Sequence, residues 1–328
     1  MGAARFARDV PSDFLTPESL DLRILQEMYR GGAPNLAGID PRLNATRIAK
    51  NLRIGRARVA SRLKAWNGSG FLERYDVWLN PALFGWQGAW VAIRVSSPRV
   101  KPELFDRLSL IDGVVSGLEF LGDWLSVGLV TPDAASLQRT LGIVRGLNGV
   151  ADLEPPMMWA LPPPRRQLTP LDIRIVRALR ERPMATLHET ARRVGISTRT
   201  MTRRYSELLE DWAVWFVPVF DFRVLMRPVV SLSLELDGKG NRTAIGREIR
   251  NRYPLTLEFQ NSQVGPPIGR DEQVLIVLPP SAAHLEELDR FVASLKGVAG
   301  QELNVMVRSR SIPEWFNRHL ETLALPPR

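Results

Sequence analysis

The pattern of apolar and polar positions occurs twice along this chain. Residues 20–25 read Leu-Asp-Leu-Arg-Ile-Leu, residues 171–176 read Leu-Asp-Ile-Arg-Ile-Val, and Leu-Thr-Pro stands shortly before each segment. Threonine followed by proline is typical of a helix start, because threonine caps a free backbone N–H and proline lacks the N–H that would stay unpaired there. The repeat predicts two copies of one unit, each opening with a capped helix.

Two more helices follow in each copy, separated by a turn that contains glycine. The later helix, about residues 56–66 or 197–209, carries apolar residues at i, i+4 and i+7, which are Val59, Leu63 and Trp66 or Met201, Tyr205 and Leu208. The first copy also contains a loop rich in Gly, Pro and Asn at residues 31–44. The predicted structure is a helix-turn-helix in each copy, followed by a strand-rich wing at residues 70–78 and 212–219.

The exposed face of each second helix is cationic and hydroxylated. Because such a helix enters the DNA major groove, we predict DNA contacts from Arg53, Arg56, Arg58, Ser61, Arg62, Lys64, Ser197, Thr198, Arg199, Thr200, Thr202, Arg203 and Arg204. Arg62 and Arg204 occupy equivalent positions beside the apolar stripe, where they would position phosphate or anchor the helix. The alternative is a pair of basic helical hairpins that bind nothing.

Between and after these units, the pattern predicts strand, helix, two strands, helix and strand, again twice. The segments are 90–95, 103–111, 114–120, 124–130, 134–147 and 150–158, and then 229–236, 243–253, 255–260, 273–278, 282–295 and 301–308. This βαββαβ order is that of a ferredoxin-like sandwich. Residues 312–323 predict a short amphipathic helix.

The predicted fold class is therefore α+β, with two winged helix-turn-helix domains alternating with two ferredoxin-like βαββαβ domains. A chain of 328 residues is long enough for several cores. The expected boundaries are an N-terminal tail at 1–14, the helix-turn-helix domains at 15–86 and 168–226, the sandwiches at 87–158 and 227–310, a proline-rich linker at 159–167 and a C-terminal tail at 311–328.

Charge suggests an anionic partner. Lys and Arg number 44 against 35 Asp and Glu, which gives a net charge of +9 and a pI of about 10.5. Only five of the 44 are lysines, a bias that a GC-rich genome also produces. Residues 44–74 hold eight basic residues and one acidic residue. Because a polyanion needs clustered charge, this clustering carries more information than the total.

Composition excludes several function classes. With no cysteine there is no disulfide, thiolate nucleophile or Cys-based metal site, and three scattered histidines leave little for metal binding, so neither metal nor cofactor is expected. No apolar run of about 18 residues and no signal peptide are present. We expect a cytoplasmic, nucleoid-associated protein without a membrane partner.

These residues resemble the Lrp/AsnC (feast/famine) family of transcriptional regulators, in a tandem-duplicated form. Leu20-Asp21 and Leu171-Asp172 are similar to the family's opening helix, Gly195-Ile196-Ser197 to its turn, and residues 80–85, Asn-Pro-Ala-Leu-Phe-Gly, to the segment after its wing. The resemblance implies sequence-specific DNA binding by the helix-turn-helix domains, and pairing by the sandwiches, which often hold an amino acid at their interface.

The resemblance also implies a ligand site, with departures. Its sandwich motif of glycine, any residue, aromatic and aspartate reads Gly122-Asp123-Trp124-Leu125 here, so leucine replaces the family aspartate. In the second copy, Gly269 and Asp271 follow an unusual loop at residues 261–268. Gly122, Asp123, Gly269 and Asp271 are the expected ligand residues, and the alternative is that the sandwiches serve only as pairing surfaces.

A chain with two sandwiches can pair them internally, so we expect an internal pseudo-dimer, with a homo-oligomer also open. Two different recognition helices would then read an asymmetric operator. If about six phosphates are neutralised, the logarithm of affinity should fall with log salt at a slope near −5.

Enzymatic function is the competing class. Some tetrapyrrole (siroheme) decarboxylases are similar in fold and occur as fused pairs, with histidine and tyrosine or arginine at the sandwich interface. Here His188 falls on the first helix of the turn motif, His284 on an outer sandwich helix and His319 in the tail, so no enzymatic activity is expected. A third class is a pure interaction module, which would be favoured only if DNA affinity were absent or independent of salt concentration.

Overall fold

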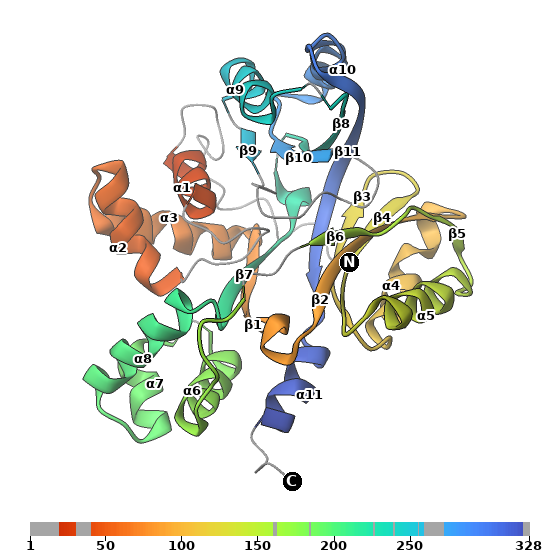
Figure 1. Cartoon of the computed structure of the whole chain (residues 1–328). Helices are drawn as coiled ribbons and strands as arrows, with labels where there is room; N and C mark the ends of the chain where they lie inside the picture. Colours follow the sequence, from red (N-terminus) through yellow and green to blue (C-terminus); the bar gives the residue numbers. More distant parts are fainter. Residues whose placement is uncertain are drawn as a thin grey trace, which may run out of the picture.

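The structure is a computed structural model, and it describes residues 20–30, 41–159, 163–183, 185–225, 227–238, 240–254, 256–258 and 272–323. It is a mixed α+β protein. Two helical units lie on the same side of the molecule, on the left in Figure 1, and the sheet with its covering helices occupies the rest.

The first helical unit comprises α1 (Leu20–Arg30), α2 (Pro41–Leu52) and α3 (Arg56–Ser69), and the second comprises α6 (Pro170–Glu181), α7 (Leu187–Val194) and α8 (Thr198–Glu210). Helix α2 begins at Pro41, inside the segment predicted as loop. The loop prediction is wrong there, because proline at a first helical position favours helix initiation. The other residues of that loop, 31–40, lie outside the described ones.

Helix α6 begins as the sequence predicts. The Thr169 side chain accepts a hydrogen bond from the Asp172 backbone N–H, the Asp172 carboxylate accepts one from the Thr169 backbone N–H, and Pro170 is the first helical residue. Such a reciprocal cap satisfies two N–H groups that a helix start leaves unpaired. The corresponding residues of the first copy, Thr16 and Pro17, lie outside the described residues.

The predicted apolar stripes are buried. Val59, Trp66, Met201, Tyr205 and Leu208 are all 0% exposed. Leu63, predicted in the same stripe, is partly buried and packs against the same core. The spacing i, i+4, i+7 therefore identified the inner face of both second helices.

One strand follows each helical unit, and the two strands pair with each other. Strand β1 (Leu72–Leu79) runs antiparallel to β7 (Val214–Phe220), with Leu72 opposite Phe220 and Leu79 opposite Val214. The predicted wing is thus a single strand in each copy, and its partner comes from the other copy. We call β1 and β7 the wing strands.

The remaining strands form a nine-stranded sheet among the described residues. The first half contributes β2 (Gln87–Val95), β3 (Val114–Phe120), β4 (Trp124–Thr131), β5 (Val150–Leu153) and β6 (Met157–Trp159); the second contributes β8 (Val229–Leu236), β9 (Thr256–Glu258), β10 (Glu272–Val277) and β11 (Val298–Ser311). The order is β5-β2-β4-β3-β11-β8-β10-β9, and β6 pairs with β2.

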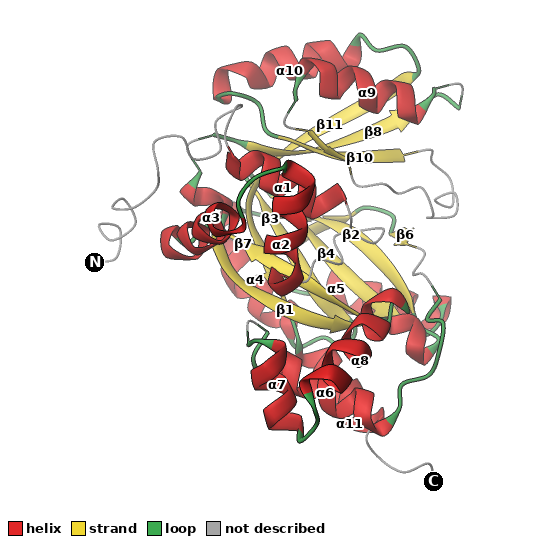
Figure 2. Ribbon diagram, turned by 90° about the vertical axis from the view of Figure 1, so that its left-hand side faces the viewer, coloured by secondary structure: helices red, strands yellow, loops and turns green. Residues whose placement is uncertain are grey.

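Helices cover this sheet. The first half supplies α4 (Lys101–Ser109) and α5 (Ala134–Arg145), and the second supplies α9 (Arg242–Arg252) and α10 (Leu285–Ala293), which lie together over β8, β10 and β11 (Figure 2). Short 3₁₀ turns are η1 (Pro81–Phe84), η2 (Pro98–Val100), η3 (Phe222–Val224) and η4 (Ala282–His284), and α11 (Glu314–Leu323) ends the described chain. His284 therefore lies in a turn before α10, and not on the predicted outer helix.

Strand β11 joins the halves. Its residues 298–306 pair with β8 and its residues 306–311 pair with β3 of the first half. The sequence predicted only residues 301–308 as strand. At the other side, the predicted strand 150–158 is split into β5 and β6, because Pro155 and Pro156 lack the N–H groups that a ladder uses.

Candidate nucleic-acid interface

The face of α3 turned away from the core carries free positive charge. Arg56, Arg58, Ser61 and Lys64 are exposed on it, and Arg53 is exposed in the turn before it. Within the described part of the chain, none of these four cations forms an ion pair. A helix face with unpaired cations can meet phosphate or guanine edges without first breaking internal contacts.

Arg62 points the other way. Its Nη2 lies 2.7 Å from Oδ2 of Asp21 on α1, and the Arg62 side chain is 15% exposed while that of Asp21 is 0% exposed. Asp21 also accepts a 2.6 Å hydrogen bond from the Trp66 indole N–H. The geometry therefore assigns Arg62 to anchoring α3 on α1, one of the two roles expected for it.

On α8 most hydroxyl groups are already engaged. Ser197 caps the helix by accepting from the Thr200 N–H at 3.1 Å, and its hydroxyl lies 2.9 Å from that of Thr200. The Thr202 hydroxyl donates to the Thr198 carbonyl at 2.9 Å, and the Thr198 hydroxyl lies 3.1 Å from Nδ1 of His188 on α7. These groups can still accept or donate a second bond, but their orientations are fixed.

The three arginines of α8 differ in their availability. Arg199 is exposed and forms no ion pair among the described residues, whereas Nη1 of Arg203 lies 3.0 Å from Glu207. Arg204 is 23% exposed, with Nη1 at 3.8 Å from Asp172 and 3.5 Å from Glu207. Arg204 repeats the anchoring arrangement of Arg62, so Arg199 is the least encumbered cation on this face.

Both units thus share one frame: a buried aspartate on the first helix lies beside an arginine on the third helix. Asp172 is also contacted at 2.8 Å by Arg166, from the segment before α6. Burial alone would raise the pKa of Asp172, but hydrogen bonds from Arg166 and Thr169 outweigh it and hold that pKa below its usual value. Asp21 and Asp172 occupy equivalent positions in the sequence repeat, which by itself indicates no role for either.

The wing strands fix the two units to one another. At one end of the pair, the Asn80 N–H donates to the Ala213 carbonyl at 2.9 Å; at the other, the Asp221 N–H donates to the Phe71 carbonyl at 2.9 Å. Phe71 stacks on Phe220 with ring centroids 4.8 Å apart. A single short sheet therefore sets the spacing of α3 and α8.

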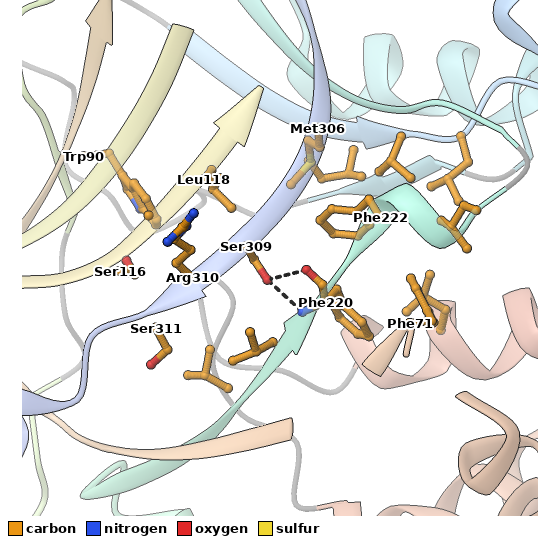
Figure 3. Close-up of a pocket in the computed structure, with 18 of the residues that line it drawn as sticks. Phe71, Trp90, Ser116, Leu118, Phe220, Phe222, Met306, Ser309, Arg310 and Ser311 are labelled. Carbon is orange, nitrogen blue, oxygen red and sulfur yellow. Dashed lines mark hydrogen bonds between the residues drawn. The ribbon is translucent and has the colours of Figure 1, made fainter. Parts of the chain in front are cut away.

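A cavity of about 70 Å³ lies between the wing strands and the large sheet (Figure 3). Apolar side chains dominate its lining, among them Trp90, Phe222 and Met306. The Ser309 hydroxyl, on β11, donates to the Phe220 carbonyl and accepts from its N–H, as Figure 3 shows. None of the three histidines lines this cavity.

Of the four expected ligand residues, the structure describes Gly122 and Asp123, which lie at the sheet margin. Gly122 is exposed at φ 84° in the turn between β3 and β4, and the Asp123 carbonyl accepts from the Val95 N–H at 2.7 Å. Burial lowers the pKa of nearby Lys101, while Glu119 and Asp123 oppose that shift. Gly269 and Asp271 lie outside the described residues.

A second feature missed by the sequence is the contact between α6 and α11. Arg180 donates to the carbonyls of Val77 and Pro313 and to Asn317, and its guanidinium carbon lies 5.6 Å from the centre of the Phe316 ring. Burial lowers the pKa of Arg180 to about 10, so it stays charged at neutral pH. In the sequence, only the position of Arg180 near the end of a predicted helix could have indicated that it joins α6 to β1 and α11.

Comparison with known proteins identifies one domain directly. Residues 168–211 match the family model of winged helix-turn-helix DNA-binding domains. These residues include the whole of α6, α7 and α8, so the second helical unit is a helix-turn-helix of the DNA-binding type. No curated protein sequence matches the chain.

Solved structures with similar folds include an enzyme and transcriptional regulators. The siroheme decarboxylase NirDL, in complex with an iron-uroporphyrin III analogue, is 15% identical, with 92% of this chain and 97% of that chain covered and a TM-score of 0.47. AsnC of E. coli is 16% identical over 45% of this chain and 95% of its own, with a TM-score of 0.29. A transcriptional regulator of Neisseria meningitidis in complex with L-Met is 20% identical over 46% and 94%, with a TM-score of 0.30.

The expectation that the chain is not an enzyme is contradicted by the first of these neighbours, since an enzyme spans 92% of the chain. At 15% identity the likeness concerns the fold, and no catalytic residue is carried over. Among the described residues, no helix has the length and apolar character needed to cross a membrane.

Proposed function

We propose that this protein is a sequence-specific, DNA-binding transcriptional regulator of the Lrp/AsnC type in which one chain takes the place of a dimer. The observation that carries the proposal is the β1–β7 pair, which ties two helix-turn-helix units into one body. In a two-fold regulator, two identical recognition helices are held at a spacing set by the dimer interface. Here the interface is internal.

The recognition surfaces are unequal. Helix α3 presents Arg56, Arg58 and Lys64, which form no ion pair with the residues that the structure describes, whereas among the arginines of α8 only Arg199 is similarly open toward those residues. An arginine that binds a guanine edge with two hydrogen bonds contributes about 1 to 3 kcal/mol of discrimination. The operator is therefore asymmetric, with the half-site under α3 richer in guanine.

An effector and an assembly state belong to the same proposal. The effector is an amino acid or similar small molecule bound at a sandwich, and whole chains associate further as a homo-oligomer. The regulator acts in the cytoplasm, on the nucleoid.

The test begins by selecting bound fragments from a random DNA library and footprinting the best one. Affinity is then measured against salt, with an expected slope near −5 for about six neutralised phosphates. Arg58→Ala should weaken binding by about 1 to 3 kcal/mol and relax one half-site, and Arg199→Ala should relax the other. Arg145→Ala, which removes an exposed arginine on α5, is the matched control.

A perfect palindrome in the footprint would contradict the single-chain pseudo-dimer, because two copies of one recognition surface would then be in use. Salt-insensitive binding, or equal loss with Arg145→Ala, would contradict DNA recognition by α3 and α8.

A further inference from the structure

The cavity between the wing strands and the large sheet is bounded by segments that lie far apart in the sequence. Leu25 of α1, Trp78 of β1 and Phe220 of β7 line it from the helical units and wing strands. Leu118 of β3 and Met306 of β11 line it from the large sheet (Figure 3). A molecule bound in this cavity would therefore contact the wing strands and the large sheet together.

The volume of the cavity, about 70 Å³, limits what it can hold. One buried water needs about 10 to 15 Å³ of such space, so the cavity has room for about five to seven water-sized groups. This is the size of a single six-membered ring with one substituent, and it is too small for a macrocycle. Cavities with apolar walls in proteins bind small aromatic molecules.

Aromatic rings form much of the wall. Phe71 stacks on Phe220 with ring centroids 4.8 Å apart, and the Phe222 ring lies 5.8 Å from that of Phe220. Trp78 and Trp90 line other parts of the cavity. Aromatic rings attract one another in offset-stacked or edge-to-face arrangements at about 4.5 to 7 Å. The wall therefore favours a planar aromatic molecule over an aliphatic one of the same size.

Ser116 of β3 adds one polar group that is not yet bonded. It lines the cavity and is 6% exposed, and its hydroxyl forms no hydrogen bond with any residue that the structure describes. The other two serines of the lining are engaged. The Ser309 hydroxyl bonds the backbone of Phe220, and the Ser311 hydroxyl accepts from the Trp78 indole N–H at 3.2 Å. Because a buried hydroxyl without a partner is unfavourable, Ser116 is suited to a polar group on a bound molecule.

The neighbouring strand leaves space for this hydroxyl. Gly128 of β4 pairs with Ser116, and a β-carbon built on Gly128 would lie 2.3 Å from the Ser116 Oγ and 3.4 Å from the Trp90 ring. Figure 3 shows Ser116 and Trp90 at the same end of the cavity, with Arg310 beside them. The Ser116 hydroxyl and an aromatic ring are therefore available together at this end.

The charge at the cavity is already paired. Arg310 is the one charged residue among the described residues of the lining, and its Nη2 lies 3.7 Å from Oε2 of Glu119. Its guanidinium carbon lies 4.5 Å from the centre of the Phe105 ring. The described lining contains no acid. A charged or zwitterionic molecule would therefore be desolvated without its own counter-ion, which costs far more than burying a neutral one.

We propose that this cavity binds a small uncharged aromatic molecule of the phenol class, with its ring against the aromatic wall and its hydroxyl hydrogen-bonded to Ser116. Free amino acids are excluded from this class by their charges, and macrocycles by their size. Binding does not depend on the proposed function; only an effect on the spacing of the two helical units would rest on it.

The test is calorimetric titration of the full chain, without DNA, with phenol and with toluene, which has the same number of heavy atoms. Phenol should bind with a Kd at or below about 1 mM. In Ser116→Ala, the ratio of the toluene Kd to the phenol Kd should fall about two- to tenfold, as expected for the loss of one hydrogen bond. This variant should keep the fold, because the hydroxyl it removes bonds none of the described residues.

A matched variant and a second measurement locate the site. Ser231→Ala removes another buried serine, on β8 and outside the cavity, and should leave the ratio unchanged. Hydrogen exchange measured by mass spectrometry with saturating phenol should become slower in β1, β3 and β7, which line the cavity, and stay unchanged in α10.

Several outcomes would overturn the proposal. It fails if neither phenol nor toluene binds, if the ratio in Ser116→Ala equals that of the wild type, or if Ser231→Ala changes the ratio equally. It also fails if benzoate or tyrosine binds as tightly as phenol, or if protection from exchange is confined to other elements. Because DNA is absent from every measurement, failure here leaves the DNA-binding proposal untouched.

Discussion

The two helical units have the same frame and different surfaces. In both, a buried aspartate of the first helix lies beside an arginine of the third helix: Asp21 is 2.7 Å from Arg62, and Asp172 is 3.8 Å from Arg204. On the outer face, the cations of α3 form no ion pair with any described residue, whereas α8 has hydroxyl groups bonded within the second unit. The comparison teaches that the residues that hold a recognition helix in place are separable from those it offers to a partner.

The described contacts of the two carboxylates differ. Asp21 contacts Arg62 and the Trp66 indole, whereas Asp172 contacts Arg166, Arg204 and the helix cap at Thr169. The second unit is also fastened to β1 and α11 through Arg180. We therefore expect the second unit to depend on Arg180 for its attachment to β1.

The largest expected effect comes from removing each buried carboxylate. Asp21→Ala and Asp172→Ala should each destabilise their own unit by about 3 to 5 kcal/mol, because the buried carboxylate is the acceptor for Arg62 and the Trp66 indole in the first unit and for Arg166 and the Thr169 cap in the second. Hydrogen exchange measured by mass spectrometry should show faster exchange in α1–α3 for the first variant and in α6–α8 for the second. Asp112→Ala is the control, since its ion pair with Arg318 is exposed and worth less than about 1 kcal/mol.

Faster hydrogen exchange in both units with either variant would show that the two units are not stabilised independently. Equal exchange in Asp112→Ala would remove the distinction between buried and exposed pairs.

Arg180→Gln should have the next largest effect. Three acceptors lose a charged donor, so we expect a loss of about 1.5 to 3 kcal/mol, confined to the contact between α6, β1 and α11. Arg177→Gln, an exposed neighbour on α6, is the matched control and should leave the urea midpoint unchanged. If Arg177→Gln also lowered the urea midpoint, the effect of Arg180→Gln would be due to the lost charge on α6 and not to the lost hydrogen bonds.

Acid should affect the second unit through Asp172. Its pKa is below the usual value in the folded chain, so its contribution is fully present above about pH 4, the unfolded pKa, and is lost as pH falls through the folded pKa. Urea midpoints followed from about pH 6 to about pH 3 should fall less steeply in Asp172→Asn than in the wild type. Parallel curves would show that other carboxylates dominate.

Local structure could be predicted from the sequence wherever neighbours along the chain decide it. The stripes through Val59 and Met201, the cap at Thr169 and strands β3 and β8 were confirmed. The pairing of β1 with β7 and the extension of β11 onto β3 could not be predicted, because both depend on partners more than 100 residues away.

The residues of the candidate interface also fall into those that local spacing could predict and those that depend on distant contacts. Periodicity placed Arg58 and Arg199 on exposed faces, since a helix face follows from spacing. It could not place the acceptors of Arg180, which meet that side chain only in the folded chain. The roles of Arg62 and Arg204 could not be decided from the sequence, because a residue at the edge of the apolar stripe can either contact phosphate or anchor the helix.

The smallest effect concerns two turns that each unit builds differently. Arg53 follows α2 and has φ 55°, whereas the equivalent residue of the second unit is Gly195, with φ 76°. Trp212 follows α8 and has φ 56°, whereas the equivalent residue of the first unit is Gly70, with φ 80°. A side chain in this left-handed region costs about 1 kcal/mol, which glycine avoids. Arg53→Gly should therefore raise the free energy of unfolding by up to about 1 kcal/mol, and Gly195→Arg should lower it by a similar amount.

Space is not the cause at Gly195, because a β-carbon built there meets nothing within 4 Å. Arg53→Ala separates backbone strain from charge, since it keeps the β-carbon and removes the guanidinium. If Arg53→Ala stabilises the chain as much as Arg53→Gly does, relief of repulsion among the cations near α3 is the cause, and the two units differ at this turn in charge density only.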